Sequence, residues 1–406
     1  MNKKSIGVLS LPVLVAALGY FVDIYDLLLF SITRVTSLES IGLSPAEIKT
    51  DGLFIINVQM LGLLLGGIIW GVLGDKKGRL SVLFGSIILY SLANIATGFV
   101  QTVPQYAMAR FIAGLGLAGE LGAGITLVSE LLSKERRGIG TSLVAGLGLF
   151  GAVFAYFISK QFDWRICYFI GGGLGFLLLF LRVSVFESGM FKSIISKNIV
   201  RGNFLMFFNN ARRFKKYMLS ILIGLPTWFV IGILVTFSKE FGEKFNLPGK
   251  IEPGKAIMYA YAGIAIGDIL IGFLSQWLKS RKKALYIFYF LTAISIALYF
   301  TQDGGSVSGM YWICACLGFS TGFWAIFVTI AAEQFGTNLR ATAATTIPNM
   351  VRGSLPLIVL LFNAFQPQYS MIQSGMITGT IILVITCIAA YFTEETFGKD
   401  LDYIED

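Results

Sequence analysis

The sequence predicts an all-α membrane protein with twelve transmembrane helices, and three observations support this fold class. Of its 406 residues, 55% are hydrophobic and only 14% are charged, whereas an ordinary soluble domain is about 25% charged. The apolar residues fall in runs of roughly twenty, the length that spans a bilayer core of about 30 Å as a helix. Short loops with charged residues, Gly or Pro separate these runs. A soluble protein of two or three domains is therefore disfavoured, although the length would allow one.

The runs fall into two sets of six. The first run is longer than the core of a signal peptide, contains Asp23 and Asp26, and is not followed by a small-residue cleavage site, so we expect it to be retained. The spans predicted in the first set are 8–31, 51–74, 80–100, 106–133, 139–159 and 166–183. Those in the second set are 217–238, 256–278, 285–300, 308–332, 341–365 and 371–392.

The distribution of Lys and Arg predicts the orientation of these spans, because cytoplasmic loops of membrane proteins hold an excess of both residues. Most of them lie on the side that carries both termini and the basic stretch between the two sets. We therefore expect a bacterial inner-membrane protein with both termini in the cytoplasm. The predicted parts are a six-helix bundle 1–184, a cytoplasmic basic linker 185–216, a second bundle 217–393 and an acidic cytoplasmic tail 394–406.

Several functional classes are excluded or disfavoured. The net charge of +9 is explained by topology and by attraction to anionic lipid heads, so no nucleic-acid partner is expected. The four cysteines, Cys167, Cys314, Cys316 and Cys387, lack metal-type spacing and are expected to pack inside spans. No phosphate-binding G-x-x-x-x-G-K-[ST], H-E-x-x-H or G-x-S-x-G motif occurs, so neither ATP hydrolysis nor another enzymatic activity is expected. We predict no metal and no cofactor.

An internal repeat relates the two halves of the chain. Glu130 and Arg137 recur as Glu333 and Arg340, in each case 203 positions later (333 − 130 and 340 − 137). The loop G-V-L-G-D-K-K-G-R-L after the second span recurs in degraded form as G-F-L-S-Q-W-L-K-S-R after the eighth. The repeat predicts two pseudo-symmetric six-helix halves in parallel orientation, with a substrate site between them near the midplane.

The loop after the second span also carries a family signature. Gly71, Asp75, Lys76, Gly78 and Arg79 match the G-x-x-x-D-[RK]-x-G-R pattern. With the repeat, this pattern resembles the major facilitator superfamily over the whole chain. The resemblance implies two six-helix bundles and secondary active transport by alternating access.

Within that superfamily the chain resembles the metabolite:proton symporter branch. The first span contains D-I-Y-D-L at 23–27, similar to E-x-Y-D-F of the branch, and the fourth contains R-x-x-x-G at 110–114 followed by a Glu at 120. The tenth closes with E-x-F-x-T-x-x-R at 333–340, and Asn349 falls where the branch has an Asn. Asp23, Leu27 and Ala118 depart from the branch, and its long C-terminal coiled coil is missing.

Ionisable residues inside predicted spans are costly to bury and are functional candidates by default. Because the chain contains no His, proton coupling has to use carboxylates. Asp23 and Asp26 share one helix face and Glu120 lies near the midplane, so these three are the proton-coupling candidates. The alternative is that Asp23 or Asp26 pairs with Arg110 to hold helices together.

Two kinds of residue are candidates for substrate binding. Arg110 and Arg352 offer paired donors for a carboxylate, although Arg352 could instead form a buried pair with Asp268. Aromatic residues on helices that the family fold turns toward the cavity form the second kind. The full set is Tyr20, Tyr25, Arg110, Trp228, Asp268, Trp324, Asn349 and Arg352.

Charged residues at the inner helix ends are gating candidates. The resemblance implies that Asp75 and Arg79 hold an outward-open state, whereas the alternative is topology control by basic residues. Within each half, Glu130 is expected to pair with Arg136 or Arg137, and Glu333 with Arg340. The predicted gating set is Asp75, Arg79, Glu130, Arg137, Glu333 and Arg340.

These observations together predict proton-coupled uptake of a small organic solute, with an organic anion favoured. The fifth span lacks the G-P signature of drug:proton antiporters in this superfamily, which favours uptake over efflux. A facilitator or exporter of a zwitterion, amino acid or polycarboxylate chelator is the alternative, and a non-transporting membrane sensor is a remote one. The expected partners are the substrate, protons and the lipid bilayer, and we expect a monomer.

Overall fold

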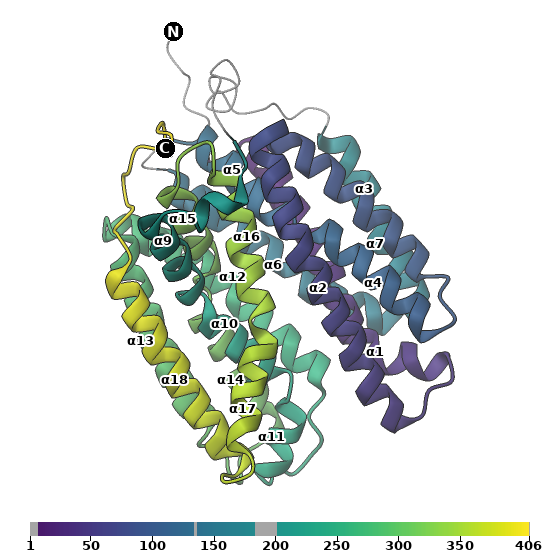
Figure 1. Cartoon of the computed structure of the whole chain (residues 1–406). Coiled ribbons are helices and arrows are strands. Elements are labelled where there is room, and N and C mark those ends of the chain that lie inside the picture. Colours follow the sequence, from purple (N-terminus) through teal and green to yellow (C-terminus); the bar gives the residue numbers. More distant parts are fainter. Residues whose placement is uncertain (1–6, 134–135, 183–200, 406) are drawn as a thin grey trace.

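The computed structural model describes residues 7–133, 136–182 and 201–405 and is helical throughout these ranges apart from turns and loops (Figure 1). Twelve helical segments are long and apolar enough to cross a membrane, which confirms the predicted number. Eleven of them begin and end within six residues of the prediction. The first continues to Ser40 rather than ending at 31, and Thr33 and Ser37 in this extension donate to carbonyls of the same helix.

The seven helices of the first half, which we call the N-half, cross the bundle six times. They are α1 (Leu11–Ser40), α2 (Pro45–Lys77), α3 (Arg79–Thr97), α4 (Val103–Leu117), α5 (Glu120–Leu131), α6 (Arg137–Gln161) and α7 (Trp164–Arg182).

The second half, the C-half, also crosses six times but is more often interrupted. Its elements are η1 (Phe204–Phe207), α9 (Ala211–Leu222), α10 (Leu225–Phe229), the π-helix η2 (Val230–Val235), α11 (Ser238–Lys244), α12 (Pro253–Trp277), α13 (Arg281–Tyr299), α14 (Val307–Ser320), α15 (Trp324–Gln334), α16 (Arg340–Gly353), α17 (Leu355–Phe365) and α18 (Met371–Phe392).

Several spans are broken inside the membrane. The fourth breaks between α4 and α5 at Gly119, and the tenth between α14 and α15 at Gly322. The two glycines are 203 positions apart (322 − 119), so the interruption belongs to the repeat. Helix breaks near the midplane free backbone groups and are a common feature of transporter binding sites.

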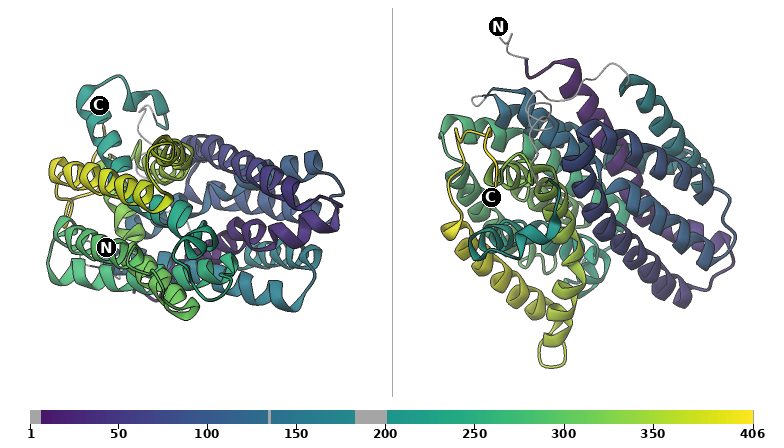
Figure 2. Two further views of the ribbon diagram at one scale, coloured as in Figure 1. Left: turned by 90° about the horizontal axis from the view of Figure 1, so that it is seen from below. Right: turned by 45° about the horizontal axis from the view of Figure 1, so that its top comes forward.

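The halves lie side by side (Figure 2) and pack closely through α2 against α16 and α6 against α12. Small residues permit this approach. A Cβ on Gly71 would lie 3.0 Å from the Thr342 Cα, and one on Gly146 would lie 2.8 Å from the Ala265 carbonyl oxygen. Small residues at such crossings are how membrane helices gain packing energy without a hydrophobic driving force.

One end of the bundle carries both the described second half of the linker, from residue 201, and the C-terminal residues 394–405 (Figure 1, top), and we call it the linker face. Residues 211–216, which the sequence assigned to the linker, form the first turns of α9, because Asn210 caps this helix by accepting from the amides of Arg212 and Arg213. Half of the predicted linker, 185–200, lies outside the described residues.

Candidate substrate site and gate

A pocket lies between the two halves at mid-depth. The N-half contributes Tyr20, Ile24 and Leu149, and in this conformation the space open to the centre of a water-sized sphere is only about 20 Å³. The lining is mostly apolar with a few placed polar groups, as is usual for small-molecule sites. The C-half contributes Thr227, Trp228, Ile231, Tyr261, Ile264, Trp324 and Arg352. Tyr20, Trp228, Trp324 and Arg352, predicted to bind substrate, therefore share one cavity.

Arg352 is the cation of this pocket and has unused hydrogen-bond donors. Its side chain is buried, its guanidinium carbon lies 5.7 Å from the centre of the Trp324 ring, and its Nη1 donates to Asn349 Oδ1 at 3.2 Å. Its Nε and the Trp324 Nε1 are buried without a hydrogen-bond partner in the described structure. Unsatisfied buried donors are costly, so an acceptor that entered the pocket would be stabilised by these groups.

Asp23 lies next to the lining residue Ile24 on α1 and is fully buried. Neither of its carboxylate oxygens has a hydrogen-bond partner in the described structure. Burial is the largest influence on this carboxyl and disfavours its charge, and Arg352 is the main charge that opposes this effect, ahead of the like charges Glu120 and Asp26. A carboxyl group in this position is linked electrostatically to the cation of the pocket across the interface between the halves.

Asp26 is held differently, since it forms the ion pair with Arg110 that was one of the predicted alternatives. Arg110 Nη1 lies 2.9 Å from Asp26 Oδ1 and 3.0 Å from Asn94 Oδ1, and Arg110 Nε donates to Gln59 at 3.3 Å. All four side chains are buried within the N-half. The prediction that Arg110 binds substrate is not supported by this geometry, because its donors are occupied away from the pocket.

Glu120 has a partner that the sequence analysis missed. Arg182, the last residue of α7, lies 2.6 Å from Glu120 and donates to the Leu83 carbonyl at 2.6 Å, while Ser86 donates to Glu120 at 2.8 Å. Helix α1 passes over this pair at Gly19, where any Cβ would collide with the Arg182 guanidinium. The only sign of this ion pair in the sequence was Gly19, a glycine on the first span that lies opposite the end of the sixth span.

Three further residues predicted to contact substrate do not line the pocket. Tyr25 turns away and donates to the Cys167 carbonyl at 2.8 Å. Asn349 spans the interface, with its Nδ2 3.0 Å from the Ala118 carbonyl and its Oδ1 on Arg352. Asp268 accepts from the Ala325 amide at 2.9 Å and forms no ion pair with Arg352, so the predicted pairing of these two described residues is wrong. Tyr261, two helical turns before Asp268, was missed although it shares that face of α12.

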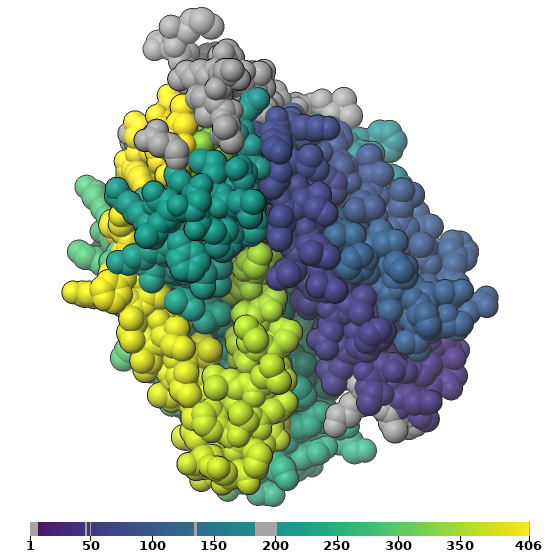
Figure 3. Space-filling view, in the orientation of Figure 1, coloured from purple at the N-terminus to yellow at the C-terminus, as the bar shows by residue number. Residues whose placement is uncertain are grey.

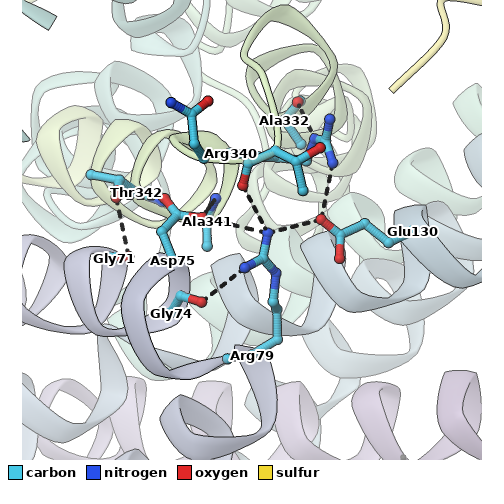
Figure 4. Close-up of polar contacts among 12 residues, drawn as sticks. Gly71, Gly74, Asp75, Arg79, Glu130, Ala332, Arg340, Ala341 and Thr342 are labelled. Carbon is cyan, nitrogen blue, oxygen red and sulfur yellow. Dashed lines mark hydrogen bonds and ion pairs between the residues drawn. The ribbon is translucent and has the colours of Figure 1, made fainter. Parts of the chain in front are cut away.

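On the linker face, Asp75 joins the two halves (Figure 4). Its carboxylate accepts from the amides of Ala341 and Thr342 at 3.0 and 2.8 Å and from the Thr342 hydroxyl at 2.7 Å. These groups form the first turn of α16, so a carboxylate of one half caps a helix of the other, with the favourable sign for the helix dipole. The predicted gating position of Asp75 therefore has a physical basis.

Glu130 lies beside this cap and pairs with arginines of both halves (Figure 4). Its Oε1 is 2.9 Å from Arg79 of the N-half and 2.9 Å from Arg340 of the C-half. Arg79 also donates to the carbonyls of Gly74 and Thr337 at 2.9 and 3.3 Å. Gly78, with φ of +102°, provides the left-handed backbone that turns α2 into α3 and places Arg79 in the cluster.

Glu333 forms the pseudo-symmetric cluster. It pairs with Arg281 of its own half at 3.1 Å and with Arg137 of the N-half at 3.6 Å. The predicted pairings within one half are therefore corrected, because Arg137 and Arg340 each reach the acid of the opposite repeat. Arg281 was missed as a gating residue, although it follows Arg79 by 202 positions (281 − 79) and closes the degraded loop motif.

The C-terminal tail covers both clusters. Thr396 donates to Glu333 at 2.7 Å, Arg137 donates to the Lys399 carbonyl at 3.2 Å, and Arg340 donates to the Leu401 carbonyl. Tyr403 accepts from the Thr337 amide at 2.8 Å. Burial alone would raise the pKa of Glu395, but hydrogen bonds from Ser280 and from the first amides of α13 hold it below its usual value. The tail is thus an ordered part of the closed linker face.

The opposite face is held less tightly. One inter-half ion pair is described there, between Lys160 and Glu252 at 2.5 Å, with both side chains about half exposed at 49% and 45%. Beyond Ser354, α17 leaves α2 and buries only Ile358 and Phe362, whereas nearly every residue of α16 is buried. In the space-filling view the halves meet along the seam between α2 and α16 (Figure 3). The conformation is therefore closed on the linker face.

Comparisons with known proteins agree with this fold. The niacin transporter NiaP of Acinetobacter baylyi is 28% identical, covering 96% of this chain and 95% of the relative. The benzoate transport protein of the same organism is 23% identical, covering 81% of this chain and 78% of the relative. The solved structure of the proton:xylose symporter XylE matches with a TM-score of 0.76 at 18% identity over 97% of each chain.

A second solved structure, the Escherichia coli fucose:proton symporter FucP, matches with a TM-score of 0.74 at 12% identity, covering 94% of this chain and 98% of the other. Identities this low establish the fold alone. The family model of the Major Facilitator Superfamily matches residues 16–360, which is most of the chain. The protein belongs to the Major Facilitator Superfamily and is an integral membrane transporter of a small molecule, not an enzyme.

Proposed function

We propose that this protein takes up a small organic anion together with a proton, and that the anion binds Arg352 in the pocket between the halves. The observation that carries this proposal is a buried guanidinium in the pocket with an unused Nε donor, together with a buried N-half carboxyl, Asp23, that has no hydrogen-bond partner in the described structure. Guanidinium groups bind carboxylates through paired, charge-assisted hydrogen bonds. The pocket therefore suits an anion better than a neutral sugar.

An aromatic monocarboxylate is the substrate class that the lining favours. Four aromatic side chains, Tyr20, Trp228, Tyr261 and Trp324, surround the space beside Arg352. Rings in such a pocket pack against a flat substrate and bury much of its surface. The names of the relatives are consistent with this class, because niacin and benzoate are aromatic carboxylates of similar size.

In this proposal, proton and substrate are coupled because Asp23 and the substrate carboxylate compete for the same cation, Arg352. Burial disfavours a charge on Asp23, and Arg352 is the main charge that offsets this effect. When a substrate carboxylate binds Arg352, this support for the Asp23 charge is largely lost, so proton uptake by Asp23 becomes more favourable. By linkage, a protonated Asp23 also favours anion binding by the same factor. Substrate and proton thus bind together, as symport requires. Asp26 keeps its own counter-ion, Arg110, and holds α1 against α4.

The linker face is the cytoplasmic face in this proposal, as the distribution of Lys and Arg supports, and the protein acts as a monomer in a bacterial inner membrane. Single cysteines in place of Lys215 and Lys250 test the orientation. Impermeant maleimide added to intact cells should label the second position and not the first. Labelling of both from outside would contradict the proposed topology.

Uptake into proteoliposomes tests the substrate class. Labelled benzoate, nicotinate, an aliphatic monocarboxylate of similar size and an uncharged sugar are compared with and without an inward proton gradient. We expect accumulation of the aromatic acids only with the gradient. Arg352→Gln should abolish their binding and Arg352→Lys should weaken it, because an ammonium cannot reproduce the paired donors. Equal uptake of the sugar by the wild type and the Arg352→Gln variant would overturn the assignment.

The coupling residue is tested by matched Asp to Asn changes. Asp23→Asn mimics the neutral state permanently, so gradient-driven accumulation should disappear while exchange of labelled for unlabelled substrate persists. Asp26→Asn leaves Arg110 with a buried, poorly compensated charge, so it should lower thermal stability and slow both processes. If Asp23→Asn still concentrates substrate and stable Asp26→Asn protein only exchanges it, the two assignments are reversed.

A further inference from the structure

We propose that Asp268 is a positioning residue that caps helix α15 from a neighbouring helix, and that this cap holds Trp324 and thereby Arg352 in place for substrate. The contact of Arg352 with substrate rests on the proposed function above. In this view Asp268 neither binds substrate nor carries the transported proton, although it is an acid buried in the middle of the membrane.

The first support is the geometry at the break of the tenth span. Helix α14 ends at Ser320 and α15 begins at Trp324, so the first amides of α15 have no carbonyl partners within their own helix. Phe323 occupies the position where a Ser, Thr, Asp or Asn side chain usually caps a helix. Asp268 of α12 supplies the missing acceptor, with its Oδ1 2.9 Å from the Ala325 amide nitrogen.

The second support is that the backbone of α12 approaches this break closely enough for a short side chain to reach. A Cβ on Gly322 would lie 2.6 Å from the Gly267 Cα and 2.8 Å from the Asp268 nitrogen. A Cβ on Gly267 would collide with the Phe319 carbonyl oxygen. The two glycines bring Asp268 beneath the open end of α15, where its carboxyl oxygen can accept from a backbone amide.

The third support is that the capped helix, α15, carries a residue that lines the pocket. Trp324 is the first residue of α15 and its ring lines the pocket. The Arg352 guanidinium lies over this ring at 5.7 Å. Fixing the first turn of α15 therefore fixes the surface on which Arg352 rests, while Asn349 holds the guanidinium from the other side.

The surroundings of Asp268 argue against the other roles. It does not line the pocket and it forms no ion pair with any described residue. Its Oδ2 is buried without a partner, so the contact that this side chain makes in the described structure is the cap. Asp75 provides a parallel within the same molecule, because it caps α16 from α2 through two backbone amides.

Replacing the charge while keeping the acceptor separates the roles. Asn is as good a helix cap as Asp, whereas Ala is not. We therefore expect Asp268→Asn to retain wild-type KM, kcat and proton-driven accumulation within about twofold, while Asp268→Ala raises KM about fivefold or more, the effect of losing a typical cap. A proton carrier would show the opposite pattern, with Asp268→Asn losing accumulation as completely as Asp268→Ala.

A readout that needs no substrate separates this proposal from the proposed function. The emission of Trp324 is obtained as the difference between each variant and the same variant carrying Trp324→Phe, in detergent and without ligand. We expect the Trp324 emission of Asp268→Asn to match the wild type and that of Asp268→Ala to shift, with acrylamide quenching increased. If the anion uptake assays fail but the Trp324 emission of the two Asp268 variants behaves as expected, only the proposed substrate is contradicted. An unchanged Trp324 signal in a folded Asp268→Ala variant would overturn the positioning role, as would loss of accumulation in Asp268→Asn.

Discussion

The linker face and the opposite face join the same two halves by different physical means. On the linker face, Asp75, Glu130 and Glu333 connect the halves through buried ion pairs and a helix cap. On the opposite face the described ion pair, Lys160 with Glu252, is half exposed. Removing one partner of a buried ion pair costs about 3–5 kcal/mol, whereas an exposed pair contributes about 0–1 kcal/mol. The ion pairs therefore favour the state that is closed on the linker face.

This difference indicates which step of the transport cycle needs a source of free energy. Opening the linker face separates buried charges, so the cycle needs a free-energy source that stabilises the other state. Binding of substrate and proton can provide it only if both bind more tightly to that state. In the proposed cycle the substrate neutralises Arg352 and the proton neutralises Asp23 beside the pocket, which removes buried charges that otherwise resist closure of the opposite face around them.

Among the changes considered, Glu130→Gln should destabilise the closed linker face most. It removes the shared partner of Arg79 and Arg340 and leaves both guanidinium groups buried, so the closed linker face should lose about 3–5 kcal/mol. Spin labels at Lys77→Cys and Lys283→Cys should report a longer inter-half distance in most molecules. Wild-type distances in a folded Glu130→Gln variant would show that the cluster does not control closure.

Asp75→Asn should have a smaller effect on the same distance. The amide oxygen of Asn can still accept from one amide of α16, but the second amide and the interaction of the charge with the helix dipole are lost. We expect a loss of about 1–2 kcal/mol, visible as a mixed distance distribution. Substrate affinity should stay near that of the wild type because Asp75 is remote from the pocket. An equal loss of binding and transport would argue against a gating role.

Removal of the tail from Lys399 onward should destabilise the closed linker face by less than Asp75→Asn does. The truncation deletes the acceptors of Arg137, Thr337 and Arg340. Water replaces part of these contacts, so the expected loss is about 1 kcal/mol. Exchange should accelerate if opening of this face limits its rate. Glu394→Gln is the matched control, because it perturbs an exposed tail contact with Arg212 without touching the clusters. Slower exchange in the truncated protein would contradict a closing role of the tail.

The sequence predicted the parts of this molecule that depend on local pattern. Span length, the repeat and the loop signature gave the number of helices, the two halves and the position of Asp75. Pairing across the halves could not be obtained in this way. Glu130 was matched to the nearby Arg137 because they are close in sequence, yet the pseudo-symmetric halves exchange these arginines when α2 and α16 pack together. The partners of Glu120 and Asp268 were missed because they depend on glycine contacts between distant spans.

Lys160→Ala should have the smallest effect, and it sharpens the comparison most directly. The side chain is about half exposed and its ion pair with Glu252 is surrounded by solvent, so its loss should cost no more than about 1 kcal/mol. Because the pair joins the halves on the face opposite the linker, the change should shift the distance between labels at Gln101→Cys and Lys250→Cys only slightly. High salt should reproduce that shift in the wild type, since screening acts on exposed charges and much less on buried ones. The same salt should leave the Lys77–Lys283 distance unchanged. If Lys160→Ala opened the opposite face widely, this single ion pair would control closure of that face, and the proposed asymmetry between the two faces would be wrong.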